Sequence, residues 1–473
     1  QAGLAVFRVL LFGFLYLSIL EYLRLKSEAW LREGNQSVSK VKPSLFSPIF
    51  WVVNSLLILS MATLVGVVAP KAEPQWPDPI AFLQRAGLPI GSGMGTPVQK
   101  VGYGENDAVL GGGFVQDDSV AFYAITPKPY YWRGESKDVY TGKGWEKSPP
   151  TELFFIPPQR EPIQLEGHPG QLFASGIDME RGQTRVYFTE ERFSTLFYQG
   201  DVIQAKVFPH DLYVQLDPRS GRFTTWEDEQ FTASKPMKEY IVESAYPQLS
   251  VKDLLAADER QIPEPILKRY TQLPEGLPSR IGELALEITA GVDSQYDRVK
   301  KIEQYFRENG FRYETKDVPV PGPEQDYVDQ FLFETKRGYC DNFSTAMVVM
   351  LRTLDIPARW VKGFTFGEII EEQEGYYYIQ VLNRHAHSWV EVYFPGVGWV
   401  PFEPTQTFTN PYSFVEEETD DDASTQQDEE ETEWEQERME HQPEKSELEE
   451  EMEEFLEEST SNGGLANYQL GET

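Results

Sequence analysis

The chain of 473 residues contains one cysteine, which begins a stretch with the apolar spacing of a helix, and strand-like stretches follow that helix. From Gly338 onward, apolar side chains recur at spacings of three and four as far as Leu354, which predicts a helix with Cys340 at its N-terminus. Three stretches rich in aromatic and β-branched residues follow and predict antiparallel strands, at residues 358–366, 376–382 and 388–394. A helix packed on such strands makes this part of the chain α+β.

A turn signal after the last of these strands predicts a hairpin. Residues 395–398 read Pro-Gly-Val-Gly, which favours a tight connection. His387 and Glu403 lie eight residues either side of Pro395, so we expect their side chains at direct or diagonal cross-strand positions, about 4.5 to 8 Å apart. An acid at that distance can orient a histidine, and a helix N-terminus favours a cysteine thiolate. Cys340, His387 and Glu403 are therefore the candidate catalytic residues.

Taken together, these segments resemble the transglutaminase-like superfamily. After the cysteine come LDIPAR at residues 354–359, HAHSWVE at 385–391 and GWVPFEPT at 398–405, in the order typical of that family. The resemblance covers about residues 281–405 and implies a papain-type α+β domain with Cys340 as nucleophile, His387 as base and Glu403 as orienting acid. Two positions depart from the family pattern. Glu403 stands where Asp is usual, and His385 stands where a small or acidic residue is common, which makes it the alternative base.

Two apolar runs precede this region. Residues 4–20 carry a single charge, Arg8, and residues 45–68 carry none, so each is long enough, or nearly so, to cross a bilayer. The loop between them holds the basic residues Arg24, Lys26, Arg32, Lys40 and Lys42, and the positive-inside rule places such a loop in the cytoplasm. We expect two transmembrane helices in residues 1–69 and the rest of the chain outside the cell; a buried core helix is the alternative for the first run. A chain that begins at Gln1, almost inside a span, suggests a piece of a larger membrane protein.

Composition divides the chain between the second run and the catalytic region. Residues 70–106 are rich in Pro and Gly and are expected to form a linker. Residues 107–245 alternate short strand-like runs with turn signals and predict a β-rich extracellular domain. Its motifs YYWRG at 130–134 and YTGKGW at 140–145 are similar to the segment before the catalytic domain in membrane-anchored bacterial transglutaminase-like proteins of the TgpA/YebA type. On physical grounds we expect these aromatic side chains in a core.

The catalytic domain is expected over residues 246–410. Two helices should lead into the site, at residues 281–290 and 293–310, the second capped by Asp293 and ended by Gly310. The proline-containing segment 316–325 that follows has the composition of a loop and should border the cleft.

Residues 411–473 are expected to form an acidic, largely disordered tail. Residues 416–460 hold 23 Asp and Glu against Arg438 and Lys445, and blocks of like charge stay solvated. This tail supplies most of the net charge of −34, which argues against nucleic-acid binding. A solvated spacer is the simplest role for it, with calcium binding or a partner helix as the alternatives. No cofactor is implied, and no cysteine or carboxylate cluster completes a metal site around His385 and His387.

Three functions fit this pattern. An activated thiol with a base and an acid can attack a carboxamide, form a thioester and pass the acyl group to an amine or to water. The first hypothesis is a membrane-anchored, outward-facing transglutaminase-like acyltransferase that acts on glutamine-type protein or peptide substrates, with the lipid bilayer as its anchor. The alternatives are a cysteine peptidase or amidase acting on cell-surface or wall peptides, and a non-enzymatic surface assembly module.

Overall fold

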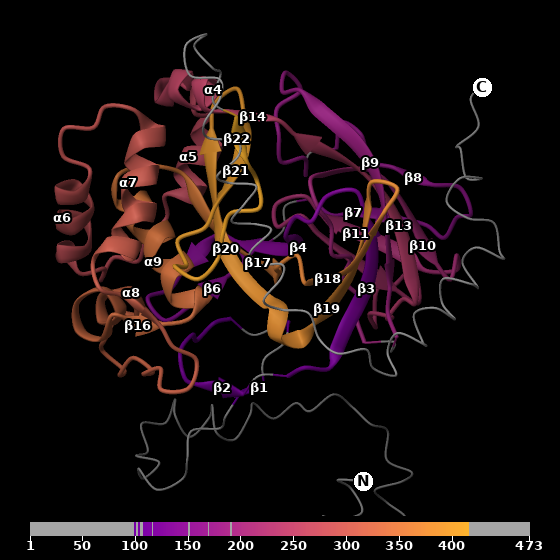
Figure 1. Ribbon diagram of the computed structural model, residues 1–473, viewed down its shortest axis with the longest axis horizontal. Coiled ribbons are helices and arrows are strands. Elements are labelled where there is room, and N and C mark those ends of the chain that lie inside the picture. The colour runs from indigo at the N-terminus through magenta and orange to yellow at the C-terminus, as the bar shows by residue number, and fades with distance from the viewer. Residues whose placement is uncertain are drawn as a thin grey trace, which may run out of the picture. The chain divides into compact units, whose positions relative to one another are not determined.

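Two antiparallel sheets form the centre of the fold, and the helices pack on the smaller one (Figure 1). The computed structural model describes residues 99–415, apart from 101–102, 105–106, 116, 150–151, 169 and 190–191. The α+β class expected around Cys340 is confirmed. Among the described residues, no helix combines the length and the apolar character needed to cross a membrane. The two predicted transmembrane runs and the acidic stretch from residue 416 lie outside the described residues.

The helices of the described region lie almost entirely in its second half. They are α4 (Val251–Ala256), α5 (Glu264–Tyr270), α6 (Ser279–Ile288), α7 (Gln295–Glu308), α8 (Tyr327–Gln330) and α9 (Cys340–Thr353), with short helical turns at Glu259–Gln261, Phe331–Thr335 and Asn383–His385. The helix predicted to begin at the cysteine is confirmed as α9, and Phe343, Met347 and Met350 on it are fully buried. The prediction that Asp293 caps the helix expected at residues 293–310 is wrong, because Ser294 accepts the hydrogen bond from Asp297 N–H and caps α7.

The smaller sheet carries the candidate histidine and has the strand order β21-β20-β17-β4. Its strands are β4 (Trp132–Lys137), β17 (Ala358–Phe364), β20 (Ala386–Phe394) and β21 (Gly398–Phe402). The predicted hairpin is confirmed, with Phe394 paired to Gly398 and Val390 paired to Phe402. Continued by one residue, this register sets Glu403 against Trp389, so the acid lies diagonal to His387 rather than directly opposite it.

The larger sheet has the order β18-β19-β3-β9-β13-β10-β8. Its strands are β3 (Val120–Thr126), β8 (Ile163–Gln164), β9 (Met179–Tyr187), β10 (Asp201–Phe208), β13 (Glu239–Pro247), β18 (Glu368–Gln373) and β19 (Tyr376–Leu382). Strands β18 and β19 come from the chain between the cysteine and the histidine, whereas β4 of the smaller sheet comes from the N-terminal half. The two halves therefore exchange strands, and the boundary near residue 245 stays a prediction.

Short pairings complete the β-structure. They involve β1 (Gln99–Lys100) with β2 (Phe114–Val115), β5 (Val139–Tyr140) with β6 (Trp145–Glu146), β7 (Phe154–Ile156) with β11 (Tyr213–Asp217) and β12 (Arg222–Trp226), β14 (Leu249–Ser250) with β22 (Phe414–Val415), and β15 (Arg312–Tyr313) with β16 (Arg337–Gly338). The pairing of β14 with β22 ties the end of the described chain back to the start of the helical region.

Both faces of β20 are buried. Val390 and Val392 lie in the core that α9 covers. On the other parity, Glu391 forms ion pairs with Arg133 of β4 (2.9 Å) and Arg359 of β17 (2.6 Å), and all three side chains are at most 4% exposed. Arg133 also donates to Tyr198, so the N-terminal half covers the second face.

Strands β4 and β17 approach each other closely beside the histidine. Gly363 pairs with His387 on one side, and on the other a Cβ at this glycine would lie 1.8 Å from the carbonyl oxygen of Trp132. A side chain at this position would force the strands apart, so the glycine permits the register that carries the site.

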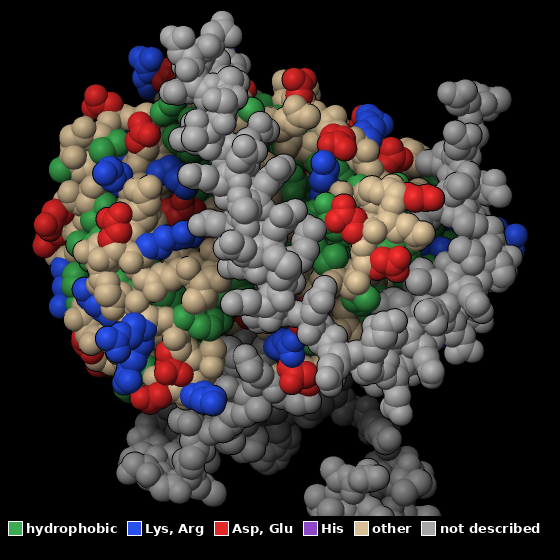
Figure 2. Space-filling model, viewed as in Figure 1, with side chains coloured by type: hydrophobic (Ala, Val, Ile, Leu, Met, Phe, Trp, Pro, Cys, Tyr) green, Lys and Arg blue, Asp and Glu red, His purple; other side chains and the backbone are tan. Residues whose placement is uncertain are grey.

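Charged side chains are mixed on the face seen in Figure 2, where Asp and Glu are interspersed with Lys and Arg over the described residues. Residues 416–460, the main source of the net negative charge in the sequence, lie outside the described residues.

Candidate active site

Cys340 is the first residue of α9, and its neighbours fix the backbone around it. The side-chain oxygen of Asn342 accepts a hydrogen bond from Tyr339 N–H over 3.1 Å. Gly338 leaves room for that amide, because a Cβ there would lie 2.2 Å from the same oxygen. The cysteine is 7% exposed and packs with Val318, at the helix end where the dipole favours a thiolate.

His387 and Glu403 form a short buried contact. The distance from His387 Nε2 to Glu403 Oε2 is 2.6 Å, and the two residues are 4% and 1% exposed. Burial lowers the pKa of His387, but the charge of the Glu403 carboxylate and the neighbouring Cys340 side chain outweigh it and raise that pKa to about 10. The fold thus brings together the three residues that the sequence singled out and favours an imidazolium among them.

Besides the contact with His387, two donors hold the Glu403 carboxylate in place, and its backbone is anchored to α7. Thr405 N–H donates to Oε1 over 2.8 Å, and the Tyr131 hydroxyl donates to Oε2 over 3.2 Å. Its own backbone N–H donates to Glu303 of α7 over 3.0 Å. Glu403 directly follows β21, and from this position its side chain, one methylene longer than the Asp usual in the family, contacts His387.

Two aromatic rings outside the predicted triad contact the imidazole. Tyr131 meets His387 edge-on with ring centroids 5.3 Å apart, and Phe408 lies 4.3 Å away. The Tyr131 hydroxyl also lies 3.0 Å from the carbonyl oxygen of Thr409, which it can donate to. These rings restrict access of water to the His387–Glu403 contact.

Sequence reasoning missed both rings. The aromatic segment around residue 131 is expected in a core, and Trp132 is indeed fully buried there, but Tyr131 lies against the candidate site. A buried tyrosine hydroxyl needs a polar partner, which is the one signal the sequence offers. Nothing in the sequence points to Phe408, which lies just beyond the last motif.

His385, the alternative base, lies elsewhere. Its Nδ1 accepts a hydrogen bond from Leu382 N–H over 3.1 Å, and its Nε2 is 3.7 Å from Glu368. Burial, with the nearby Arg384 charge, lowers the pKa of His385 to about 4. This histidine belongs to the turn before β20 and does not join Cys340. Within the described part of the chain, no group of three or more His, Cys, Asp or Glu side chains is placed to hold a metal ion.

A cysteine that opens a helix, packed on an antiparallel sheet that presents a histidine and an acid, defines the papain-type class of cysteine-nucleophile α+β proteins. Within that class, residues 282–404 match the family model of the transglutaminase-like superfamily. Residues 282–404 thus form a transglutaminase-like domain, and the chain is similar to the bacterial protein YebA.

YebA of Bacillus subtilis, an uncharacterized protein, is 38% identical over 432 residues, which are 90% of this chain and 55% of YebA. A protein-glutamine gamma-glutamyltransferase of Pseudomonas aeruginosa is 35% identical over 137 residues, which are 29% of this chain and 20% of that protein. The crystal structure of the periplasmic domain of TgpA from Pseudomonas aeruginosa is 24% identical, with 61% of this chain and 88% of that chain covered and a TM-score of 0.45. The chain thus spans only part of the length of either curated relative.

Proposed function

We propose that this chain is a membrane-anchored, outward-facing transglutaminase-like acyltransferase in which Cys340, His387 and Glu403 act as nucleophile, base and orienting acid. The observation that carries the proposal is the 2.6 Å contact between His387 and Glu403 beside a cysteine that opens a helix. The substrates we propose are proteins or peptides with glutamine-type carboxamides, and the acyl acceptor is a primary amine.

The chemistry follows from the groups present. The Cys340 thiolate attacks the carboxamide carbon, and the carbonyl electron pair moves to oxygen, where the backbone N–H of Cys340 supplies a hydrogen bond. The His387 imidazolium gives its proton to the leaving ammonia as the C–N bond breaks, which leaves a thioester. An amine then attacks the thioester, His387 takes its proton, and the thiolate departs. Water in place of the amine gives a carboxylic acid.

The membrane placement rests on the two apolar runs at residues 4–20 and 45–68 and on the basic loop between them. Protease added outside intact cells should digest an epitope placed in residues 416–460, whereas an epitope in residues 21–44 should be protected. Protection of both epitopes would contradict the outward orientation.

The activity is tested with the full chain in detergent micelles, a glutamine-containing peptide and a labelled primary amine. Incorporation of the amine that disappears in Cys340→Ala supports acyl transfer. The matched control is His385→Gln, which should keep the activity because this histidine does not join the site. Cleavage of the peptide chain instead of incorporation supports the peptidase alternative. A folded protein that does neither supports a non-enzymatic module and overturns the proposal.

A further inference from the structure

A buried chain of hydroxyl groups ends at the residue that follows Cys340. Trp360 Nε1–H of β17 donates to Ser344 Oγ of α9 over 3.0 Å. Ser344 Oγ lies 2.7 Å from the carbonyl oxygen of Cys340 and 2.9 Å from Ser388 Oγ of β20. Ser388 Oγ in turn lies 2.6 Å from Asp341 Oδ1. Ser388 follows His387 and Asp341 follows Cys340, so this last contact links the two candidate catalytic positions.

The number of protons in this chain sets the charge of Asp341. Three contacts link the Cys340 carbonyl to Ser344, Ser344 to Ser388, and Ser388 to Asp341, and each needs one proton to be a hydrogen bond. The two serine hydroxyls supply only two protons. Trp360 already donates to Ser344, so it adds no proton to these three. A proton on the Asp341 carboxyl completes the set, with Asp341 donating to Ser388, Ser388 to Ser344, and Ser344 to the carbonyl. Without it, one contact lacks a hydrogen bond.

Asp341 is also close enough to Cys340 to affect the charge on sulfur. Cys340 Sγ lies 3.9 Å from Asp341 Oδ1, so an ionised carboxylate there opposes a thiolate. The other charged groups that face Asp341 are Asp107, Lys362 and His387, and the hydroxyls of Tyr313, Tyr327 and Tyr339 also act on it or on the adjacent thiol.

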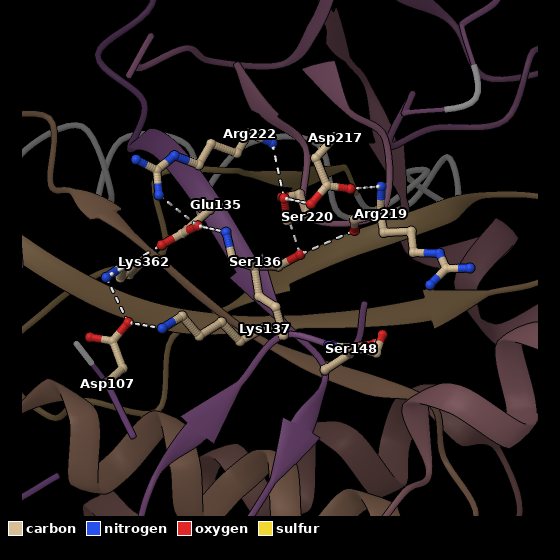
Figure 3. A network of polar contacts seen from close by, with 12 residues as sticks. Asp107, Glu135, Ser136, Lys137, Ser148, Asp217, Arg219, Ser220, Arg222 and Lys362 are labelled. Atoms are coloured by element: carbon tan, nitrogen blue, oxygen red, sulfur yellow. Dashed lines mark hydrogen bonds and ion pairs between the residues drawn. The ribbon is translucent and has the colours of Figure 1, made fainter. Parts of the chain in front are cut away.

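Lys362, the cation that acts on Asp341, belongs to a larger cluster of ion pairs in which Glu135 also contacts Lys147 and Arg222. Figure 3 shows Lys362 of β17 between Asp107 (2.6 Å) and Glu135 (3.4 Å), with Lys137 also paired to Asp107. Lys362 therefore pairs with two other carboxylates, which weakens its attraction for an ionised Asp341.

We propose that Asp341 is a positioning residue for the nucleophile: its carboxyl proton completes the hydrogen-bond chain to Ser388, and its ionisation raises the cost of forming the Cys340 thiolate. The electrostatics agree with this geometry, since burial raises the pKa of Asp341 to about 6, although a hydrogen bond that Ser388 donates to the ionised carboxylate opposes this shift. The inference rests on the proposed function in taking Cys340 as the nucleophile.

The test measures the acidity of the Cys340 thiol in the full chain, without any acyl substrate. The rate of alkylation by iodoacetamide and the thiolate absorbance at 240 nm are followed from pH 4.5 to 9, with Cys340→Ala as the blank. Asp341→Asn keeps the shape and can donate its amide proton to Ser388. It should lower the apparent pKa of the thiol by about one to three units, the effect of removing one charge at this distance in a medium between water and protein interior.

Two further variants make the result specific. Asp341→Ala removes the charge but cannot donate to Ser388, so it should lower the thiol pKa in the same direction while losing more amine incorporation than Asp341→Asn. Asp228→Asn, in the turn after β12, makes the same chemical change far along the chain and should leave the alkylation profile unchanged. Either Asp341 variant suffices for the measurement if the other does not fold.

An apparent thiol pKa that stays the same or rises in the Asp341 variants overturns the inference, whatever happens to activity. A downward shift in the Asp341 variants, when the parent protein itself incorporates no amine, supports the inference and contradicts the proposed function instead. The two failures are therefore distinguishable, because alkylation reports on the thiol alone and amine incorporation reports on the complete reaction.

Discussion

The hydroxyl of Tyr131 donates a hydrogen bond to the carboxylate of Glu403 over 3.2 Å, although the two residues are 272 positions apart in the chain. The tyrosine comes from the β-rich N-terminal half, whereas the glutamate follows the last strand of the transglutaminase-like region. The orientation of the candidate acid thus depends on both halves of the chain.

Tyr131→Phe removes this hydroxyl and leaves the ring in place. Loss of one hydrogen bond to a charged group should reduce amine incorporation by about tenfold and the free energy of unfolding by about 1 to 2 kcal/mol. The control is Tyr130→Phe, because that neighbouring ring packs on Tyr246 and Tyr412 rather than on the triad. Equal rates for the two variants would show that the Tyr131 hydroxyl does not support Glu403.

Glu403→Gln keeps the shape of the acid but removes its charge, so the imidazolium at His387 loses its partner. By analogy with the loss of the acid in serine protease triads, we expect kcat for amine incorporation to fall by about 10³- to 10⁴-fold. Glu403→Asp keeps the charge but has a shorter side chain, and its rate should lie between those of the parent protein and Glu403→Gln. A Gln variant within a factor of two or so of the parent rate would remove the acid from the mechanism.

The His387–Glu403 pair should make stability depend on alkaline pH. The pKa of His387 is about 10 in the folded protein and about 6.5 in an unfolded chain, so the folded state binds its proton more tightly. This contribution to stability is complete below about pH 6.5 and is lost as the pH rises towards about 10. The difference in unfolding free energy between the parent protein and His387→Gln, measured in urea, should therefore shrink over that interval.

His385 supplies the matched control for that measurement. Its folded pKa of about 4 lies below the ordinary value, so its effect on stability changes only between about pH 4 and 6.5. The difference between the parent protein and His385→Gln should stay constant from pH 7 to 10. A parallel decline in both variants would assign the pH dependence to other groups.

Glu391→Gln should be strongly destabilising, because it leaves the guanidinium groups of Arg133 and Arg359 buried without their carboxylate. We expect a loss of about 3 to 5 kcal/mol in the free energy of unfolding. Glu166→Gln breaks the solvent-exposed pair with Arg181 and should change little, since water screens such pairs. Similar small losses for both would show that the ion cluster between the two halves is not an important source of stability.

The parts of the fold that the sequence predicted well are local. The helix from Cys340 and the hairpin around residues 395–398 follow from side-chain period and turn chemistry, and the hairpin brings His387 near Glu403. Even there, the register could be predicted only to within a direct or a diagonal pairing, because the turn residues do not fix which position is the centre.

The parts that sequence reasoning missed depend on contacts between distant segments. Strand β18 has exposed carboxylates along much of its length and gave no buried alternation, yet it completes the edge of the larger sheet. Trp389 and Glu391 lie on the face of β20 opposite Val390 and Val392, where the sequence pattern suggests exposure to solvent. Both are buried, because the N-terminal half covers that face. The placement of Tyr131 has the same cause.

The strand exchange between the two sheets has a consequence for biosynthesis. Strands β3 and β4 leave the ribosome long before β19 and β17, the partners that later pair with them. Until translation reaches those partners, the nascent N-terminal half presents open sheet edges that can pair with other chains. A holding chaperone bound during synthesis of the intervening stretch would protect those edges, and a prematurely terminated chain should be prone to aggregate.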